Sequence, residues 1–280
     1  MVAIVNEANI PAETFGAGAE RRRLLTQTRV PQARVRVDRL SLGRESACTV
    51  SVPDGALGWF MMLRGEAQLQ HGSEREKLRE VHAGLLPGGL EARFSSVNGA
   101  ELLYAEVPDA AELDPNLAAG PLQVRLVDRE REPVLDSKHD ARKRIYVATP
   151  KLTGTKALKA EVIVYPPNTT GSNHHHEGAE HFMYVIEGRT AGYSNEIPHE
   201  YVTGDLVYHP GGERHYAATG AEGMTFIEFF VPAEYRTVWV DESRICTWLP
   251  TGKDSRGGKP VREIQAHDSL AAGRATPADL

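Results

Sequence analysis

Apolar and polar residues alternate with a period of two from Arg34 onward, and this pattern predicts strands. The run R-V-R-V-D-R-L-S-L is followed by A-C-T-V-S-V, G-W-F-M-M-L-R-G and E-A-Q-L-Q-H, separated by Pro-Asp-Gly and Arg-Gly turns. On a strand, successive side chains point to opposite faces, so each run can bury one face and expose the other. We therefore expect an antiparallel meander in the first half of the chain.

The second half repeats the turns of the first half at a constant offset. Gly65 ends W-F-M-M-L-R-G as Gly188 ends F-M-Y-V-I-E-G, and Pro87 lies as far beyond Gly65 as Pro210 lies beyond Gly188. Two independent turns at the same spacing indicate an internal duplication. The predicted fold class is therefore all-β, with two β-barrels in tandem.

Segments with little apolar pattern divide the chain into domains. Pro108 to Pro121 is punctuated by proline and glycine and is typical of a connector, whereas Lys253 to Leu280 is typical of a flexible tail. We therefore expect a polar lead-in at 1–33, a first barrel at 34–108, a connector with extra strands at 109–150, a second barrel at 151–248 and a flexible tail at 249–280.

The composition is that of an ordinary globular protein. Of the 280 residues, 41% are hydrophobic, and the net charge of −6 gives no electrostatic basis for binding nucleic acid or an anionic membrane surface. The start, M-V-A-I-V-N-E, has no basic segment leading into an apolar run, so we predict neither a signal peptide nor a membrane span. Cys48 and Cys246 form no motif, and a reducing, cytoplasmic setting is expected.

A histidine-rich stretch beginning at Asn173 suggests a metal site. It reads N-H-H-H-E-G-A-E-H-F-M-Y-V-I-E-G. His174 and His176 alternate, so on a strand both imidazoles point to the same face. His215 ends a second stretch, G-D-L-V-Y-H-P-G-G-E-R-H. Three imidazoles and a carboxylate on strands form a donor set for a divalent transition metal.

These two stretches resemble the two sequence motifs of the cupin family. The second motif, G-x5-P-x-G-x2-H, is matched by Gly204, Pro210, Gly212 and His215, with Thr219 in place of the usual Asn. The first motif, H-x-H-x3,4-E-x6-G, is matched by His174, His176 and Gly188. The resemblance covers about residues 155–235. It implies that the two barrels are cupin barrels and that the second one binds metal.

The acidic position of the first motif has two candidates. Glu180 lies at the x3 spacing from His176, whereas His181 has the x6 spacing to Gly188. Neighbours on a strand face opposite ways, so one of the two is expected to be a ligand and the other not. The commoner cupin set of three histidines and one carboxylate favours Glu180, and the strand register favours His181.

The first barrel lacks all of these ligands. At the repeat offset, Ser51, Pro53, Leu57, Gly58 and Ala92 stand where the second barrel has His174, His176, Glu180, His181 and His215. None of the five replaces an imidazole or carboxylate on a transition metal. We therefore expect one ion per chain and a first barrel without metal.

Two further residues are candidates for catalysis. Glu228 lies among apolar residues in M-T-F-I-E-F-F-V; facing inward it is a general base, and facing outward it is an exposed strand residue. Tyr208 and His209 precede the Pro-Gly turn, and alternation sends them to opposite faces. One of them is expected to line the pocket and to hydrogen-bond substrate.

The resemblance implies a metal-dependent enzyme acting on a small anionic or aromatic/enolic compound. We expect Fe(II) or Mn(II) rather than Zn(II) or Ni(II), and dioxygenation as the leading reaction. The alternatives are a non-oxidative hydrolase, isomerase or lyase similar to ureidoglycine aminohydrolase, a bicupin with metal in one barrel, and a non-catalytic cupin that binds small molecules. Exposed sheet edges predict a homodimer.

Overall fold

The computed structural model describes residues 1–118, 122–268 and 280, and it consists almost entirely of antiparallel strands, as predicted. The chain divides into two compact units. The N-terminal unit comprises Asn6–Asp128 with Thr153–Ala157, and the C-terminal unit comprises Met1–Val5, Arg129–Leu152 and Leu158–Leu280.

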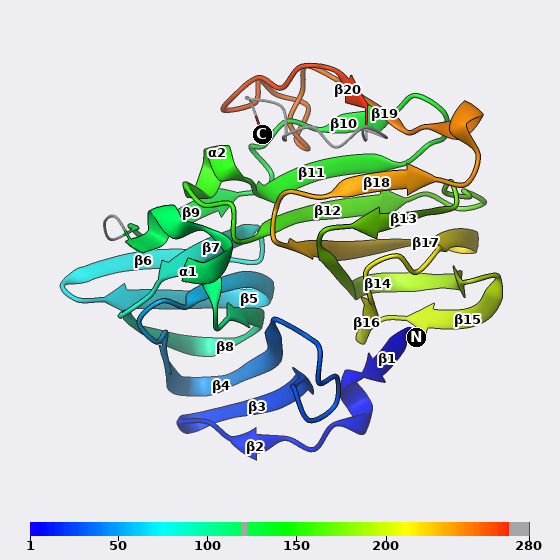
Figure 1. The fold of residues 1–280 in the computed structure, drawn as a ribbon. Helices are drawn as coiled ribbons and strands as arrows, with labels where there is room; N and C mark the ends of the chain where they lie inside the picture. The colour runs from blue at the N-terminus through cyan, green and yellow to red at the C-terminus, as the bar shows by residue number, and fades with distance from the viewer. Residues whose placement is uncertain (119–121, 269–279) are drawn as a thin grey trace. The chain divides into compact units, whose positions relative to one another are not determined.

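The N-terminal unit is built on one sheet, which has eight strands within the described residues (Figure 1). Its path is β2-β3-β4-β8-β5-β7-β9, and β6 pairs with β5. The strands are β2 (Glu13–Thr14), β3 (Ala17–Leu25), β4 (Arg36–Ser51), β5 (Leu57–His71), β6 (Glu74–Arg79), β7 (His82–Pro87), β8 (Glu91–Val107) and β9 (Arg125–Asp128). The short helix α1 (Ala110–Leu113) and the 3-10 turns Glu7–Asn9 and Pro115–Ala118 complete it.

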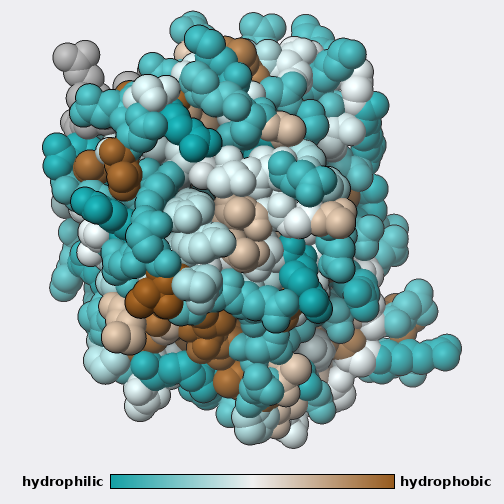
Figure 2. Space-filling view, turned by 90° about the vertical axis from the view of Figure 1, so that its right-hand side faces the viewer, coloured by the Kyte–Doolittle hydropathy of each residue, from teal (hydrophilic) through white to brown (hydrophobic). Residues whose placement is uncertain are grey.

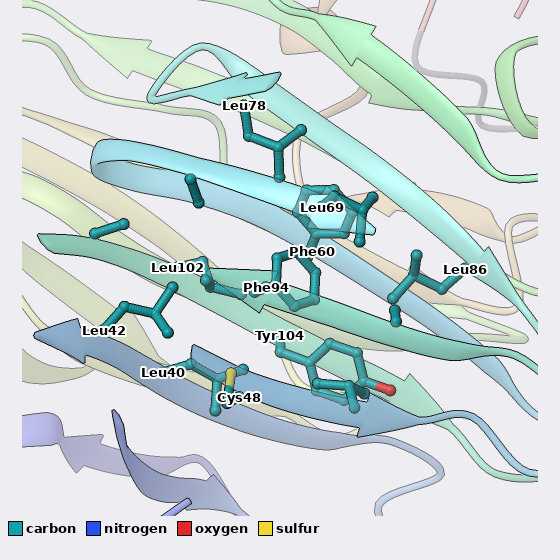
Figure 3. Close-up of a cluster of buried hydrophobic side chains, with 14 of the residues drawn as sticks. Leu40, Leu42, Cys48, Phe60, Leu69, Leu78, Leu86, Phe94, Leu102 and Tyr104 are labelled. Carbon is teal, nitrogen blue, oxygen red and sulfur yellow. The ribbon is translucent and has the colours of Figure 1, made fainter. Parts of the chain in front are cut away.

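The alternation of apolar residues in β4, β5 and β8 fills the core of this unit. Phe60 and Phe94 meet edge to face at 5.1 Å between ring centroids, and both are fully buried. Figure 3 shows them among Leu40, Leu69 and other inward-pointing side chains. An apolar core occupies the interior of this barrel.

The C-terminal unit is built on a second sheet, with twelve strands within the described residues (Figure 1). Its path is β1-β16-β14-β17-β12-β11-β10-β19-β20; β13 pairs with β17 and β18, and β15 pairs with β14. The strands are β1 (Ala3–Asn6), β10 (Leu135–Ser137), β11 (Lys143–Ala148), β12 (Lys159–Tyr165), β13 (His174–Glu177), β14 (Glu180–Ser194), β15 (Ile197–Val202), β16 (Asp205–His209), β17 (His215–Val231), β18 (Arg236–Trp239), β19 (Thr247–Pro250) and β20 (His267–Asp268). The helix α2 (Pro150–Thr153) and the 3-10 turn Glu242–Arg244 lie between strands.

The same bulge occurs in both units, which supports the duplication predicted from the sequence. The pairing of β5 with β8 shifts register after Gly65, and that of β14 with β17 shifts after Gly188. Both glycines have positive φ, at 73° and 87°. A Cβ at either position would collide with backbone, on Gly99 in one unit and on Gly223 in the other. Only glycine satisfies both constraints at this point of the fold.

The ends of the chain contain more structure than the sequence pattern indicates. The predicted lead-in at 1–33 contains β3, which pairs with β4 through alternation that charged residues obscure. The predicted tail at 249–280 contains β20, paired with β19. Residues 269–279 of that predicted tail and residues 119–121 of the predicted connector lie outside the described residues.

One face of the molecule is shown in a space-filling view. The face in Figure 2 is mainly hydrophilic, and its hydrophobic residues form small scattered groups. Across the described residues, no helix has the length and apolarity needed to cross a membrane.

Candidate metal centre

Two short strand pairings bring three histidines together. His174 and His176 lie on β13, opposite Trp239 and Thr237 of β18. His174 also pairs with His215, the first residue of β17. The two-residue period of β13 places both of its imidazoles on one side. One ligand atom from each of His174, His176 and His215 lies within 4.8 Å of the others.

A second pairing adds two more histidines. His181 of β14 lies opposite His209, the last residue of β16. Their ligand atoms and that of His215 also lie within 4.8 Å of one another. Glu180 is not among the residues that line the cavity described next, because it precedes His181 and its side chain leaves the opposite face of β14. The structure thus brings His181, rather than Glu180, to the other histidines.

The five imidazoles line one small cavity inside the C-terminal unit. Its volume is about 60 Å³, and Glu228, Phe230 and Tyr235 also line it. His176, His181, His209 and His215 are all less than 8% exposed. Neighbouring rings are in contact, with centroids 4.6 Å apart for His174 and His215 and 4.3 Å apart for His209 and His215.

The protein holds one nitrogen of each imidazole in the first histidine group. Nδ1 of His174 donates to the Ser172 carbonyl at 2.8 Å, and Nδ1 of His215 donates to the Glu213 carbonyl at 2.9 Å. Nδ1 of His176 hydrogen-bonds the Thr237 hydroxyl at 3.2 Å. Bonds of this kind fix the ring and its tautomer in metal-binding histidines, leaving Nε2 free to ligate.

The remaining nitrogens fit a metal ion. Nε2 of His176, Nε2 of His215 and Nδ1 of His181 are buried and have no hydrogen-bond partner among the described residues. Unsatisfied buried nitrogens destabilise a fold unless something binds them. Several such lone pairs converging on one cavity are what a divalent transition metal requires.

Burial also keeps these imidazoles neutral. Desolvation lowers the pKa of His174 and His181 to about 3 and that of His209 to about 4. It lowers the pKa of His176 and His215 well below the usual value, and the neighbouring histidines add to this shift. At neutral pH each ring therefore retains a lone pair for a metal ion.

Comparisons with known proteins agree with this arrangement. Residues 161–230 match the family model described as a cupin domain. The second barrel is a cupin domain. No curated protein sequence matches the chain. The matched segment contains both sequence motifs, and with them His174, His176 and His215.

Solved structures extend the likeness to both barrels. Two mutants of Bacillus subtilis oxalate decarboxylase align with TM-scores of 0.66 and 0.67 at 14% and 15% identity, each over 85% of this chain and 79% of that one. The protein Ylba from E. coli aligns with a TM-score of 0.64 at 10% identity, over 82% of this chain and 90% of that one. At these identities the likeness concerns the fold, and the chain has a bicupin fold.

Glu228 connects the histidines of the cupin barrel to a buried set of charges. Its Oε2 accepts a hydrogen bond from Nε2 of His181 at 3.1 Å, and its Oε1 lies 3.6 Å from the Arg144 guanidinium. Arg144 also pairs with Glu161 at 3.1 Å, and Glu161 lies 3.4 Å from Lys159. Glu228 faces inward, which is the orientation that a general base requires.

Desolvation dominates the ionisation of the pair behind Glu228. Burial lowers the pKa of Lys159 and raises that of Glu161, although each opposes the shift of the other. The ammonium of Lys159 also donates to the Tyr235 hydroxyl at 3.0 Å. Tyr235 lines the cavity, so this charge cluster lies directly behind its wall.

A second arginine reaches the cavity from β10–β11. Arg142 is paired with Asp140 at 2.7 Å and donates to the Tyr165 hydroxyl at 3.1 Å and to Cys246 Sγ at 3.3 Å. These bonds fix the guanidinium at the cavity wall.

The structure resolves the alternatives that the sequence left beside the turn. His209 lines the cavity, whereas Tyr208 is not among its lining residues and instead stacks on Phe182 at 6.4 Å. Because alternation sends the two side chains to opposite faces, Tyr208 does not reach the metal centre. The reasoning from sequence also missed Arg144, Lys159 and Glu161. The signal for Lys159 and Glu161 was two charged residues on the same face of an otherwise apolar strand, and Arg144 directly precedes the apolar run I-Y-V-A.

Proposed function

We propose that this bicupin binds one divalent metal ion in its C-terminal unit and uses it to transform a small anionic compound. The observation that carries the proposal is the convergence of buried, neutral imidazoles on one cavity that also contains Glu228. A purely structural cluster would not leave Nε2 of His176 and of His215 without a partner among the residues that the structure describes.

The charge of the site favours an anion. Around the cavity, Arg142, Arg144 and Lys159 are offset by Asp140, Glu161 and Glu228 through the ion pairs described above. The imidazoles are neutral, so a divalent ion would give the site a net positive charge. A carboxylate, enolate or phenolate group would neutralise this charge.

The volume of the cavity limits the substrate to a small molecule. A cavity of about 60 Å³ has room only for a compact ligand. Arg142 and Arg144 supply donors at the wall, and the rings of Phe230 and Tyr235 supply apolar surface. The arrangement suits a compact anion with a planar portion.

Dioxygenation with Fe(II) or Mn(II) is the leading reaction. When bound, the metal supplies Lewis acidity and, as Fe(II), the ability to activate O2. Glu228 accepts the proton that the substrate loses on becoming an enolate or phenolate. Its bond to His181 holds its carboxylate at the cavity, and the Arg144 guanidinium lies 3.6 Å from its other oxygen.

A non-oxidative lyase or hydrolase is the second candidate. The same Glu228 can return a proton to a carbanion after loss of CO2, and such a reaction needs no oxidant. The similarity in fold to oxalate decarboxylase favours decarboxylation within this class.

Reconstitution of the apo-protein separates the two candidates. The protein is loaded with Fe(II), Mn(II) or Zn(II) and assayed against catechols, diketones, small dicarboxylates and ureido compounds, with and without oxygen. We expect turnover coupled to oxygen uptake with Fe(II) or Mn(II). Turnover under strictly anaerobic conditions would reject dioxygenation in favour of the lyase or hydrolase. Metal binding without turnover of any compound would favour a binding protein.

A further inference from the structure

We propose that His209 is a ligand of the same metal ion and that Glu213 positions it for that role. This inference rests on the metal site proposed above and extends it beyond the histidines of the two cupin motifs. In the sequence, His209 directly precedes the Pro-Gly turn and occupies a variable position of the second motif, where the pattern specifies no residue.

Position is the first argument. The ligand atom of His209 lies within 4.8 Å of those of His181 and His215, the same span that joins His174, His176 and His215. The ring of His209 stacks on that of His215 at 4.3 Å with an interplanar angle of 16°, and the side chain is 1% exposed. A histidine with a merely apolar role would not be aligned with two other ligand nitrogens.

Orientation is the second argument. Nδ1 of His209 donates to Oε2 of Glu213 at 3.1 Å, so the ring keeps its lone pair on Nε2. A carboxylate bonded to the far nitrogen of an imidazole fixes the ring and makes it a stronger ligand. His174, His176 and His215 are also held through Nδ1, although their partners are two backbone carbonyls and a hydroxyl rather than a carboxylate.

Glu213 is itself fixed on both sides. Its Oε1 accepts the Val2 amide of the N-terminal segment at 2.9 Å, and its own amide bonds the Pro210 carbonyl at 3.1 Å. The carbonyl of Glu213 accepts the bond from His215. One residue therefore orients two imidazoles, His209 through its carboxylate and His215 through its backbone.

A single ion accounts for both histidine groups. His215 belongs to both, and its Nδ1 is occupied by the Glu213 carbonyl. Only its Nε2 remains, and one lone pair serves one metal ion. The two groups therefore form one site that shares His215, with His181 and His209 from one group and His174 and His176 from the other.

Cobalt binding tests this assignment without reference to activity. Apo-protein is titrated with Co(II) for the wild type, His209→Gln and Glu213→Gln, with His199→Gln on β15 as a control, because His199 does not line the cavity. We expect His209→Gln to weaken Co(II) binding at least about tenfold and to change the visible d–d spectrum. Glu213→Gln should weaken binding about 10- to 100-fold and largely keep the spectrum. His199→Gln should match the wild type.

The outcomes separate this inference from the proposed function. If His209→Gln keeps the wild-type affinity and spectrum while His176→Ala loses Co(II), His209 is not a ligand but the metal site stands. If the wild type binds no Co(II), both proposals fail. Near-UV circular dichroism checks folding. Where His209→Gln does not fold, His209→Asn and Glu213→Gln report on the same ligand, and wild-type behaviour in both would overturn the inference.

Discussion

The carboxylate of Glu228 contacts both the histidine cluster, through His181, and the buried ion pairs, through Arg144. It accepts from His181, lies near Arg144 and faces the cavity. Its bond to His181 goes to Nε2, the nitrogen opposite the free Nδ1. It can therefore influence His181, a proposed metal ligand, without binding the ion itself.

Replacing Glu228 should separate catalysis from metal binding. In Glu228→Gln we expect one equivalent of metal to bind at saturating metal concentration, with an affinity weakened about as much as in Glu213→Gln, and a fall in turnover of about 10²- to 10⁴-fold in the metal-saturated protein, because the proton acceptor is lost. Elemental analysis and steady-state rates on the substrate found by reconstitution measure the two effects. The control is Glu222→Gln, an exposed position on the same strand β17. Full activity in Glu228→Gln would exclude it as the base.

Asp38 carries a pH-dependent part of the stability of the N-terminal unit. It lies 3.8 Å from Arg21, and burial raises its pKa to about 6 despite that partner. Since the native pKa exceeds the unfolded value, protonation favours the fold. This contribution is complete below about pH 4 and is lost as the pH rises through about 6.

Removing the carboxyl should therefore flatten the pH profile. We expect the stability of Asp38→Asn, relative to the wild type, to rise by up to about 3 kcal/mol between pH 4 and pH 7.5. Urea unfolding at the two pH values gives the free energy of unfolding of each protein. Comparing the change between the two pH values in the variant with that in the wild type removes the pH-independent effect of losing the contact with Arg21. An equal pH dependence in both proteins would show that Asp38 titrates normally.

At the level of elements, strand register placed the residues that the sequence could not. Motif spacing located His174, His176 and His215 because these spacings are local. Glu180 and His181 differ by one position, and only the pairing of β14 with β16 and β17 shows which of them faces the cavity. Arg144 and Glu161 meet across β11 and β12, and no short pattern links residues on separate strands.

The bulge at Gly188 should be essential for this register. Gly188 and Gly212 both have positive φ, at 87° and 81°, but an added Cβ would strike the Gly223 backbone at the first and meets nothing within 4 Å in the described structure at the second. Gly212→Ala should cost about 1–2 kcal/mol from conformation alone, and Gly188→Ala should exceed this by about 2 kcal/mol or more because backbone must move. Urea unfolding measures both. Equal losses would mean that the β14–β17 bulge tolerates a side chain.

At the level of the whole molecule, the two units share their strand arrangement and bulge glycines but differ in the histidines that could bind a metal. The turns at Gly65 and Gly188 predicted the repeat correctly because bulge glycines are fixed by geometry. One ion pair is also shared, because Arg21–Asp38 in one unit and Arg144–Glu161 in the other occupy equivalent positions of the repeat. Both histidine groups found among the described residues lie in the C-terminal unit.

Assembly is a property that the strand edges predict. Unpaired edge strands favour association unless they are covered, and we expect a homodimer. Light scattering at micromolar concentration should give twice the chain mass of 30.7 kDa. A species at the mass of one chain would contradict this expectation.

The metal content of purified protein tests the central claim most directly. Elemental analysis should find one equivalent of a divalent transition metal in the wild type and in His199→Ala, and almost none in His176→Ala or His215→Ala, whose free Nε2 atoms define the site. A full equivalent of tightly bound metal in both His176→Ala and His215→Ala would contradict the account.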